Sequence, residues 1–186
     1  YLAVSSANNQ VNVIFPATWS GGQDVYYARI PAPDVTLTGT LTLGDWIPDE
    51  AGQVVNYEIL NVSGATVQSG ILTLGAAGTY SLKLNPDLCH IALTVKLKGA
   101  HWLTKTVYTG SVGLAGQAMG VDVASNGNTH NVDNTIDIAD YTDLALAFDA
   151  TPASSNWNAN ADLNGDGVVD IADYTILALH FDETGD

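Results

Sequence analysis

The sequence has little cysteine and few basic residues, and each shortage excludes a class of protein. Cys89 is the only cysteine among 186 residues, so the chain forms no internal disulfide. Only 5 Lys and Arg residues stand against 20 Asp and Glu residues, and the net charge of −15 argues against nucleic acid and anionic membranes as partners. No run of ~18 apolar residues is present, so no membrane span is expected.

The negative charge is concentrated at one end of the chain. Residues 1–120 carry 7 acidic and 5 basic residues, whereas residues 121–186 carry 13 acidic residues and no Lys or Arg. A compact domain with that charge repels itself unless cations are bound within it. The composition therefore indicates two domains, of which the second binds metal.

The pattern before residue 120 is typical of short strands. Residues 35–43 (VTLTGTLTL) alternate strictly between apolar and polar side chains, which predicts a half-buried strand. Further strands are expected at 54–60, 65–74, 79–84, 91–98 and 103–110, with turn residues between them. This spacing predicts an antiparallel, Ig-like β-sandwich over residues 33–118, with residues 111–120 as a linker or a last short strand.

Residues 1–32 precede that sandwich and contain two further apolar runs, at 11–15 and 25–30. Both are expected to be short strands. They either pair with their own sandwich or add a strand to the sheet edge of a neighbouring molecule. The second alternative would make the protein a self-polymerising filament subunit.

The chain contains an internal duplication after residue 118. Residues 135–149 (TIDIADYTDLALAFD) and 168–182 (VVDIADYTILALHFD) are identical at eleven of fifteen positions, at an offset of 33. Each copy continues with apolar residues at helical spacing, Tyr141-Leu144-Ala145-Phe148 and Tyr174-Leu177-Ala178-Phe181. The repeat predicts a small α domain over residues 119–186 in which each half is a loop followed by a helix.

The loop of the second copy has the order of an EF-hand calcium loop. Ca²⁺ takes six to eight oxygen ligands, which alternate residues of a tight loop supply. Gly167 at position 6 permits the turn, and Val169 at position 8 is expected to be buried against its counterpart. The expected ligands, at positions 1, 3, 5, 7 (through the backbone carbonyl), 9 and 12, are Asp162, Asn164, Asp166, Val168, Asp170 and Asp173.

The loop of the first copy keeps most of these positions but lacks an acidic residue at position 1. Positions 3, 5, 7, 9 and 12 are Asn131, Asp133, Thr135, Asp137 and Asp140, and Asn134 replaces the glycine, as a residue that also adopts left-handed backbone. Position 1 is Thr129, a poor calcium ligand. The hypothesis is that residues 124–130 are a looped-out insertion and that Asp122 supplies the ligand. Thr129 or water in its place, or no metal, are the alternatives.

The stretch WNANADLNGDGVVDIADYTILALHF resembles the second half of a dockerin domain, and the resemblance covers residues 121–186. It implies two calcium ions, two antiparallel loop–helix halves and docking to a protein partner, either a cohesin-like domain or another copy of the chain. In dockerins, positions 10 and 11 carry much of the specificity. Here both pairs are the same, Ile138-Ala139 and Ile171-Ala172, which would allow two docking modes related by a half-turn unless they pack against the sandwich.

The stretches GTLTLGDWIPDEAGQVVNYEI, GAAGTYSLKL and VKLKGAHWLTKTV resemble a transthyretin-like or CnaB-like module, of a kind that accompanies dockerins in some secreted bacterial proteins. With few lysines, many Thr, Asn and Gly residues and Tyr1 rather than Met first, the chain is expected to be secreted or at a cell surface. No nucleophile motif is present, so a non-catalytic assembly protein is expected. A carbohydrate-binding sandwich is the further alternative, through Trp19, Tyr26, Tyr27, Trp46 and Trp102.

Overall fold

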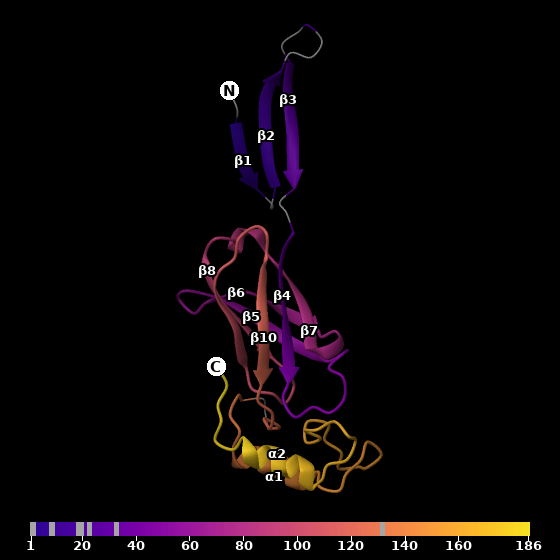
Figure 1. Cartoon of the computed structure of the whole chain (residues 1–186). Helices are drawn as coiled ribbons and strands as arrows, with labels where there is room; N and C mark the ends of the chain where they lie inside the picture. The colour runs from indigo at the N-terminus through magenta and orange to yellow at the C-terminus, as the bar shows by residue number, and fades with distance from the viewer. Residues whose placement is uncertain (1–2, 8–9, 18–20, 22–23, 32–33, 131–132) are drawn as a thin grey trace.

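The N-terminal strands form a sheet of their own. The computed structural model describes residues 3–7, 10–17, 21, 24–31, 34–130 and 133–186. Strands β1 (Ala3–Ala7), β2 (Gln10–Ala17) and β3 (Asp24–Pro31) pair antiparallel in the order β1-β2-β3. The strands expected at 11–15 and 25–30 are thus present. Within the described residues they pair with each other, so the alternative in which they pair with their own sandwich is wrong (Figure 1).

Residues 35–124 form a sandwich of two sheets. One sheet has the order β10-β4-β7 and the other β6-β5-β8-β9. All six strands expected between residues 35 and 110 are confirmed within one or two residues at each end. The strands are β4 (Val35–Leu43), β5 (Val54–Asn61), β6 (Thr66–Thr73), β7 (Thr79–Leu84), β8 (Ala92–Lys98), β9 (Lys105–Ser111) and β10 (Gln117–Ala124), with 3-10 turns at Ala76–Gly78 and Pro86–Leu88.

The alternation in β4 points one face of the strand into the sandwich core. Val35, Leu37 and Leu41 are fully buried, and the threonines between them lie on the other face. The facing sheet contributes residues such as Ile59 and Val95, also fully buried. Each Å² of apolar surface buried between the two sheets stabilises the fold by roughly 25 cal/mol, and this burial holds the short strands together.

Strand β10 differs from the sequence-based expectation in direction and length. It pairs with β4 in parallel, not antiparallel, because the segment after β9 crosses to the other sheet and returns beside the first strand of the sandwich. It also continues to Ala124, so the boundary expected between residues 118 and 119 falls inside a strand. The residues after Ala124 therefore leave the sandwich directly from its sheet.

The two helices lie at the opposite end of the sandwich from the β1–β3 sheet (Figure 1). Helices α1 (Ile138–Leu146) and α2 (Ile171–Leu179) each begin after an aspartate N-cap with a second aspartate completing a capping box. They enclose a second apolar cluster, separate from the sandwich core, that contains Ile136, Leu144, Val169 and Leu177. Ile136 and Val169, the position-8 residues of the two loops, are fully buried there as expected.

The two halves are tied to each other by backbone pairing. The amide of Val169 donates to the carbonyl oxygen of Ala150 at 3.0 Å, and the amide of Ile136 donates to that of Glu183 at 2.9 Å. Each loop is thus bonded to the segment that follows the other helix. Among the described residues, no helix is long and apolar enough to cross a membrane.

The packing around the 3-10 turn at Ala76–Gly78 gives a test of the sandwich. Gly78 has φ +71°, and a Cβ there would lie 2.1 Å from the carbonyl oxygen of Leu41. Gly52 has φ +90° with open space around it, so Gly52→Ala isolates the backbone strain. We expect Gly52→Ala to cost about 1 kcal/mol of unfolding free energy and Gly78→Ala about 3 kcal/mol, because the second also overpacks the site. Urea denaturation of both variants measures the difference, and equal losses would contradict the packing described.

Candidate functional site

The second loop folds around its own acidic side chains. The Asp162 carboxylate accepts hydrogen bonds from the backbone amides of Gly165 at 2.9 Å and Gly167 at 3.0 Å. The Asp173 carboxylate, on the first turn of α2, accepts from the amide of Leu163 at 2.7 Å and of Asp170 at 2.8 Å. Position 1 and position 12 of the loop are thereby both turned inward, with Gly165 and Gly167 in left-handed conformations that permit the turn.

Burial of these side chains makes their charge costly. Asp162 is 6% exposed, Asn164 5% and Asp173 0%. Burial raises the pKa of the Asp162 and Asp173 carboxyls, the neighbouring Asp166 charge raises both further, and the backbone amides act in the opposite direction. Two partly desolvated carboxylates beside a third, with an amide oxygen from Asn164, form an oxygen donor set that suits a hard divalent cation better than zinc or copper.

The side chains are not gathered as a ready metal cluster. Within the described ranges, no group of three or more His, Cys, Asp and Glu side chains stands close enough to hold a metal ion. The loop carboxylates instead accept from backbone amides; Asp166, for example, accepts from Val168 at 2.9 Å. The expected ligands Val168 and Asp170 lie in the same loop, and Asp170 caps α2 by accepting from Ala172 at 2.7 Å.

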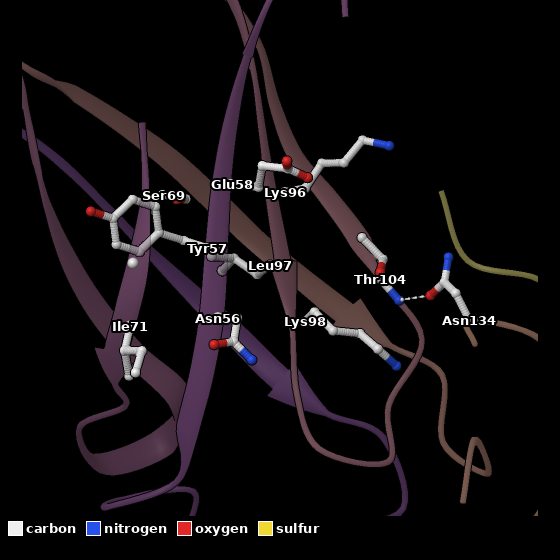
Figure 2. Close-up of a pocket in the computed structure, with 11 residues that line it drawn as sticks. Asn56, Tyr57, Glu58, Ser69, Ile71, Lys96, Leu97, Lys98, Thr104 and Asn134 are labelled. Carbon is white, nitrogen blue, oxygen red and sulfur yellow. Dashed lines mark hydrogen bonds between the residues drawn. The ribbon is translucent and has the colours of Figure 1, made fainter. Parts of the chain in front are cut away.

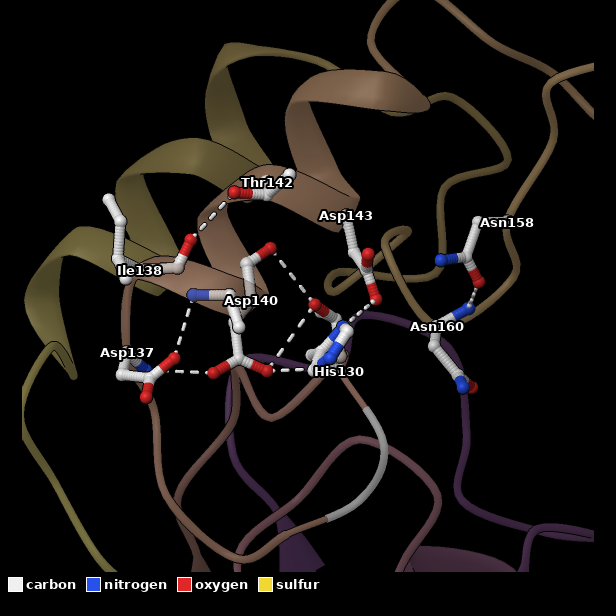
Figure 3. Close-up of polar contacts among 10 residues, drawn as sticks. His130, Asp137, Ile138, Asp140, Thr142, Asp143, Asn158 and Asn160 are labelled. Atoms are coloured by element: carbon white, nitrogen blue, oxygen red, sulfur yellow. Dashed lines mark hydrogen bonds and ion pairs between the residues drawn. The ribbon is translucent and has the colours of Figure 1, made fainter.

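The first loop has the same frame as the second, counted without an insertion. The amide of His130 donates to the Asp140 carboxylate at 2.7 Å and that of Asp137 at 2.8 Å, which repeats the contacts of Leu163 and Asp170 with Asp173 (Figure 3). The Thr135 amide donates to Asp133 at 3.1 Å, as Val168 does to Asp166. Thr129 therefore holds position 1, and its hydroxyl donates to the Asp140 backbone oxygen at 3.0 Å.

Asp122 does not reach this loop, and the looped-out insertion is corrected accordingly. Asp122 lies within β10 opposite Leu41, where Lys105, Asp186 and Tyr80 are its electrostatic neighbours. Residues expected to loop out are instead structural, because Asn126, Asn128 and Thr129 are buried. Of the remaining expected ligands, Asn131 lies outside the described residues. Asn134 has φ +71°, so the left-handed conformation expected of it is confirmed.

The exposed side of the helix pair carries two matching pockets, each of about 450 Å³. They are related by the 33-residue repeat, since every lining residue of one pocket has its counterpart in the other. The first is lined by Tyr141, Leu144, Ala145, Phe148, Ile171 and Tyr174, and the second by Tyr174, Leu177, Ala178, Phe181, Ile138 and Tyr141. Tyr141 and Tyr174 stack edge to face between them, with ring centroids 5.9 Å apart.

Position 10 of each loop lies on this face, since Ile171 lines the first pocket and Ile138 the second. Ile138 is 66% and Ile171 65% exposed, and Ala139 and Ala172 are not buried, so packing of these pairs against the sandwich is excluded. Phe181 belongs to the same helical apolar spacing as Leu177 in the sequence. Leu177 is buried, but α2 ends at Leu179, and Phe181 is 42% exposed at the pocket rim, as Phe148 is.

The second loop is attached to the sandwich by direct contacts. The amide of Ile47 donates to the carbonyl oxygen of Asn164 at 2.9 Å. Buried Asn126, which follows β10, donates to the Leu163 carbonyl at 2.7 Å and bonds the ring of His101 at 2.8 Å. Burial lowers the His101 pKa to about 4, so the ring is neutral and its Nδ1–H donates to Asn126.

Two tryptophans of the sandwich pack where it contacts the second loop, which argues against carbohydrate binding by their rings. Trp102 is 1% exposed and donates from Nε1 to the Gly44 carbonyl at 3.0 Å. Trp46 packs edge to face on Trp102 and covers Gly165 of the second loop. Neither ring is an open platform for a sugar, and Trp19 lies outside the described residues. Tyr27 is 63% exposed, but in the separate β1–β3 sheet.

Comparison with known proteins supports the fold. No family model and no curated protein matches the chain. Two solved structures of type II cohesin–X-dockerin complexes from Acetivibrio cellulolyticus, an N-terminal and a C-terminal interface mutant, each contain a similar chain. The TM-scores are 0.65 and 0.62 at 20% and 19% identity, over 81% of this chain and 97% of that chain in both cases. The chain therefore shares the β-sandwich fold found in these cohesin–dockerin assemblies.

His180 links the end of α2 to the sandwich and predicts a pH effect. Its Nε2 lies 3.0 Å from Asp45 and its Nδ1 3.1 Å from Glu183. Burial alone would lower the His180 pKa, but hydrogen bonds and charges of Glu183 and Asp45 outweigh it and raise the pKa. Because the folded pKa lies above the unfolded value, this stabilisation is full below about pH 6.5 and is lost as pH rises through the raised pKa.

We expect His180→Gln to lose less than about 1 kcal/mol, since the pairs are partly open to solvent. That loss is expected near pH 6 and to vanish at pH values well above the raised His180 pKa, where the imidazole is neutral in both states. Thermal unfolding of both proteins across this range measures it. A deficit that is constant with pH would show that the pairs do not depend on the His180 charge.

Proposed function

We propose that this protein is a non-catalytic, extracellular calcium-binding module that docks onto a protein partner through the exposed face of α1 and α2. The observation that carries the proposal is the combination of an EF-hand-like second loop with two repeat-related apolar pockets beside it. The first supplies a reason for calcium to be bound, and the second supplies a surface that calcium would hold in place.

The buried charge of the second loop favours a bound calcium ion. Asp162 and Asp173 are desolvated, their pKa values are raised, and the only compensation within the loop is a few backbone amides. A divalent ion held by the loop oxygens would favour the ionised carboxylates and offset their repulsion. The expected ligands Asp162, Asn164, Asp166, Asp170, Asp173 and the Val168 carbonyl supply only oxygen, as calcium requires.

The two helices leave an apolar surface uncovered, which favours docking to a partner. Ile138, Ile171, Leu146 and Leu179 are each at least 65% exposed. A cluster of this kind on a small helical unit marks an interaction surface. Exposed acidic residues, including Asp149 and Asp182, lie just after the helix ends, and residues 121–186 have no Lys or Arg. The matching partner surface is therefore apolar at its centre and carries no excess of acidic residues around it.

The partner we infer is a cohesin-type β-sandwich domain. The similar chains belong to type II cohesin–X-dockerin complexes. The similarity covers 81% of 186 residues, about 151, which is more than the 124 residues that end with β10, so it includes residues after the sandwich. Together with the dockerin-like repeat, this favours a cohesin over a second copy of the chain as the occupant of the helix face.

The calcium step predicts a stability that depends on the metal. We expect calcium at 100 times its dissociation constant to raise the unfolding free energy by about 2.7 kcal/mol, and chelator to remove that gain. Asp162→Asn should lose most of this response, because position 1 loses its charge. Calorimetry with and without chelator measures it, with Asp149→Asn as a control of equal charge change outside the loop. If the wild-type protein unfolds at the same temperature in calcium and in chelator, the calcium proposal fails.

The docking step predicts a redundancy that follows from the repeat. Ile138→Asp and Ile171→Asp each disturb one pocket, and an aspartate at the first turn of a helix does not oppose the helix dipole. With two equivalent pockets, we expect each single variant to bind a cohesin domain within about threefold of wild type and the double variant to lose at least about tenfold, or 1.4 kcal/mol.

Titration calorimetry against purified type II cohesin domains in calcium measures this loss, with Val62→Asp on the sandwich as the control. Binding by the double variant at wild-type affinity would exclude the helix face. Failure of every cohesin to bind, with a dimer or filament in the pure protein that the double variant abolishes, would show that the occupant is a second copy.

A further inference from the structure

Lys98 of the sandwich lies against the first calcium-type loop. It is the last residue of β8, opposite Asn56 of β5, and its half-buried side chain lies beside Thr104 and Asn134 (Figure 2). The Lys98 ammonium donates a hydrogen bond to the backbone oxygen of Trp102. The charges of Asp133 and Asp140, positions 5 and 12 of the first loop, raise the pKa of Lys98 through space.

Asn128 joins this ammonium to the loop backbone. Asn128 is fully buried, one residue before position 1, and only one orientation of its amide satisfies its neighbours. In that orientation its oxygen accepts from the Lys98 ammonium at 3.0 Å and from the amide of Asn134 at 2.8 Å. One oxygen thus contacts both the cation and the residue at position 6.

Asn128 takes the role that the Asp162 carboxylate has in the second loop. There the position-6 amide, that of Gly167, donates to the carboxylate of Asp162 at 3.0 Å. In the first loop Thr129 holds position 1 and its hydroxyl donates to Asp140, so the contact to the position-6 amide comes from Asn128 instead. The charged position-1 group of the second loop is therefore exchanged for a neutral amide, with an ammonium bound to it.

We propose that the Lys98 ammonium is the resident cation of the first loop, and that the chain therefore binds calcium at the second loop alone. This rests on the proposed calcium site of the second loop and changes the expected number of ions from two to one. The first loop has three aspartates, Asp133, Asp137 and Asp140, where the second has four, and the missing charge is the one at position 1.

The charge of the ammonium is maintained at neutral pH. Burial lowers the Lys98 pKa to about 8, and the Asp133 and Asp140 carboxylates act against that effect. A calcium ion in the first loop would have to approach this ammonium with one acidic ligand fewer than in the second loop. A lysine supplied by the sandwich also ties the first half of the helical region to β8 without metal.

Calcium stoichiometry tests the proposal directly. Native mass spectrometry and titration calorimetry of the full chain should give one calcium ion per chain. Thr129→Asp combined with Lys98→Met restores position 1 and removes the ammonium, and should raise the count to two. The matched control is Thr129→Asp with Lys96→Met, which removes a lysine two residues away on the same strand, and should leave the count at one.

A second measurement does not depend on variants. In chelator, we expect the amides of Asp137 and Ala139, which donate to Asp140 and Asp137, to keep hydrogen-exchange protection. The corresponding amides of Asp170 and Ala172 should exchange at least about tenfold faster than in calcium. Equal loss of protection in the two halves would overturn the proposal.

The measured calcium counts distinguish a failure of this inference from a failure of the proposed calcium-binding function on which it rests. A count of two in the wild-type protein, or of one in the Thr129→Asp/Lys98→Met variant, would overturn the inference and leave the calcium-binding function standing. A count of zero in the wild-type protein would overturn the calcium function itself.

Discussion

The structure depends on how positive charge is supplied to residues 121–186. This segment has 13 acidic residues and no Lys or Arg, and several of its carboxylates are buried. Backbone amides satisfy these carboxylates as hydrogen-bond acceptors, but an amide carries only a partial charge and leaves the repulsion between neighbouring aspartates in place. We propose that further positive charge comes from a calcium ion at the second loop and from the sandwich at the first, which connects the two parts of the molecule.

The sandwich contributes a positive charge to the first loop but only neutral contacts to the second. Toward the first loop it presents Lys98 at the end of β8. Toward the second it presents no Lys or Arg in the described contacts, but Trp46 and the amide of Ile47, which fix the loop backbone at Gly165 and Asn164. A Cβ at Gly165 would lie 2.5 Å from the Trp46 ring, so glycine at this position serves the contact as well as the turn. The second loop is thus positioned by neutral contacts and left with its charge uncompensated.

Much of this could be predicted from the sequence because it rests on local patterns. Strict alternation located β4, the repeat located both helices, and the spacing of oxygen side chains located the second loop. Asp122 could not be assigned in the same way. Its distance along the chain suited an insertion, but the pairing of β10 with β4 is a long-range contact, and it keeps Asp122 in a sheet. The parallel direction of β10 was missed for the same reason.

The role of Lys98 shows which signal could have been used. The sequence has five basic residues, and the scarcity of lysine made each one informative, but its partner Asn128 is thirty residues away and has no charge. Residues 121–186 contain no Lys or Arg that could compensate the acidic loops, which suggests two ions. Compensation by a lysine of the sandwich could not be predicted, because the end of β8 lies beside the loop only in the folded chain.

The two repeats therefore have matching pockets on the exposed helix face but different contacts at their loops. The pockets on the helix face are lined by the same residue types in the same order, so a partner would meet nearly the same surface in either orientation. Underneath, one helix begins at a loop joined to the sandwich through Lys98 and Asn128, and the other at a loop whose carboxylates have no such cation. Because Ile171 of α2 completes the pocket of α1, and Ile138 that of α2, both pockets need both loops in place. Disorder in the second loop alone would then be enough to disturb either orientation of docking, so a single ion could control a surface built from two repeats.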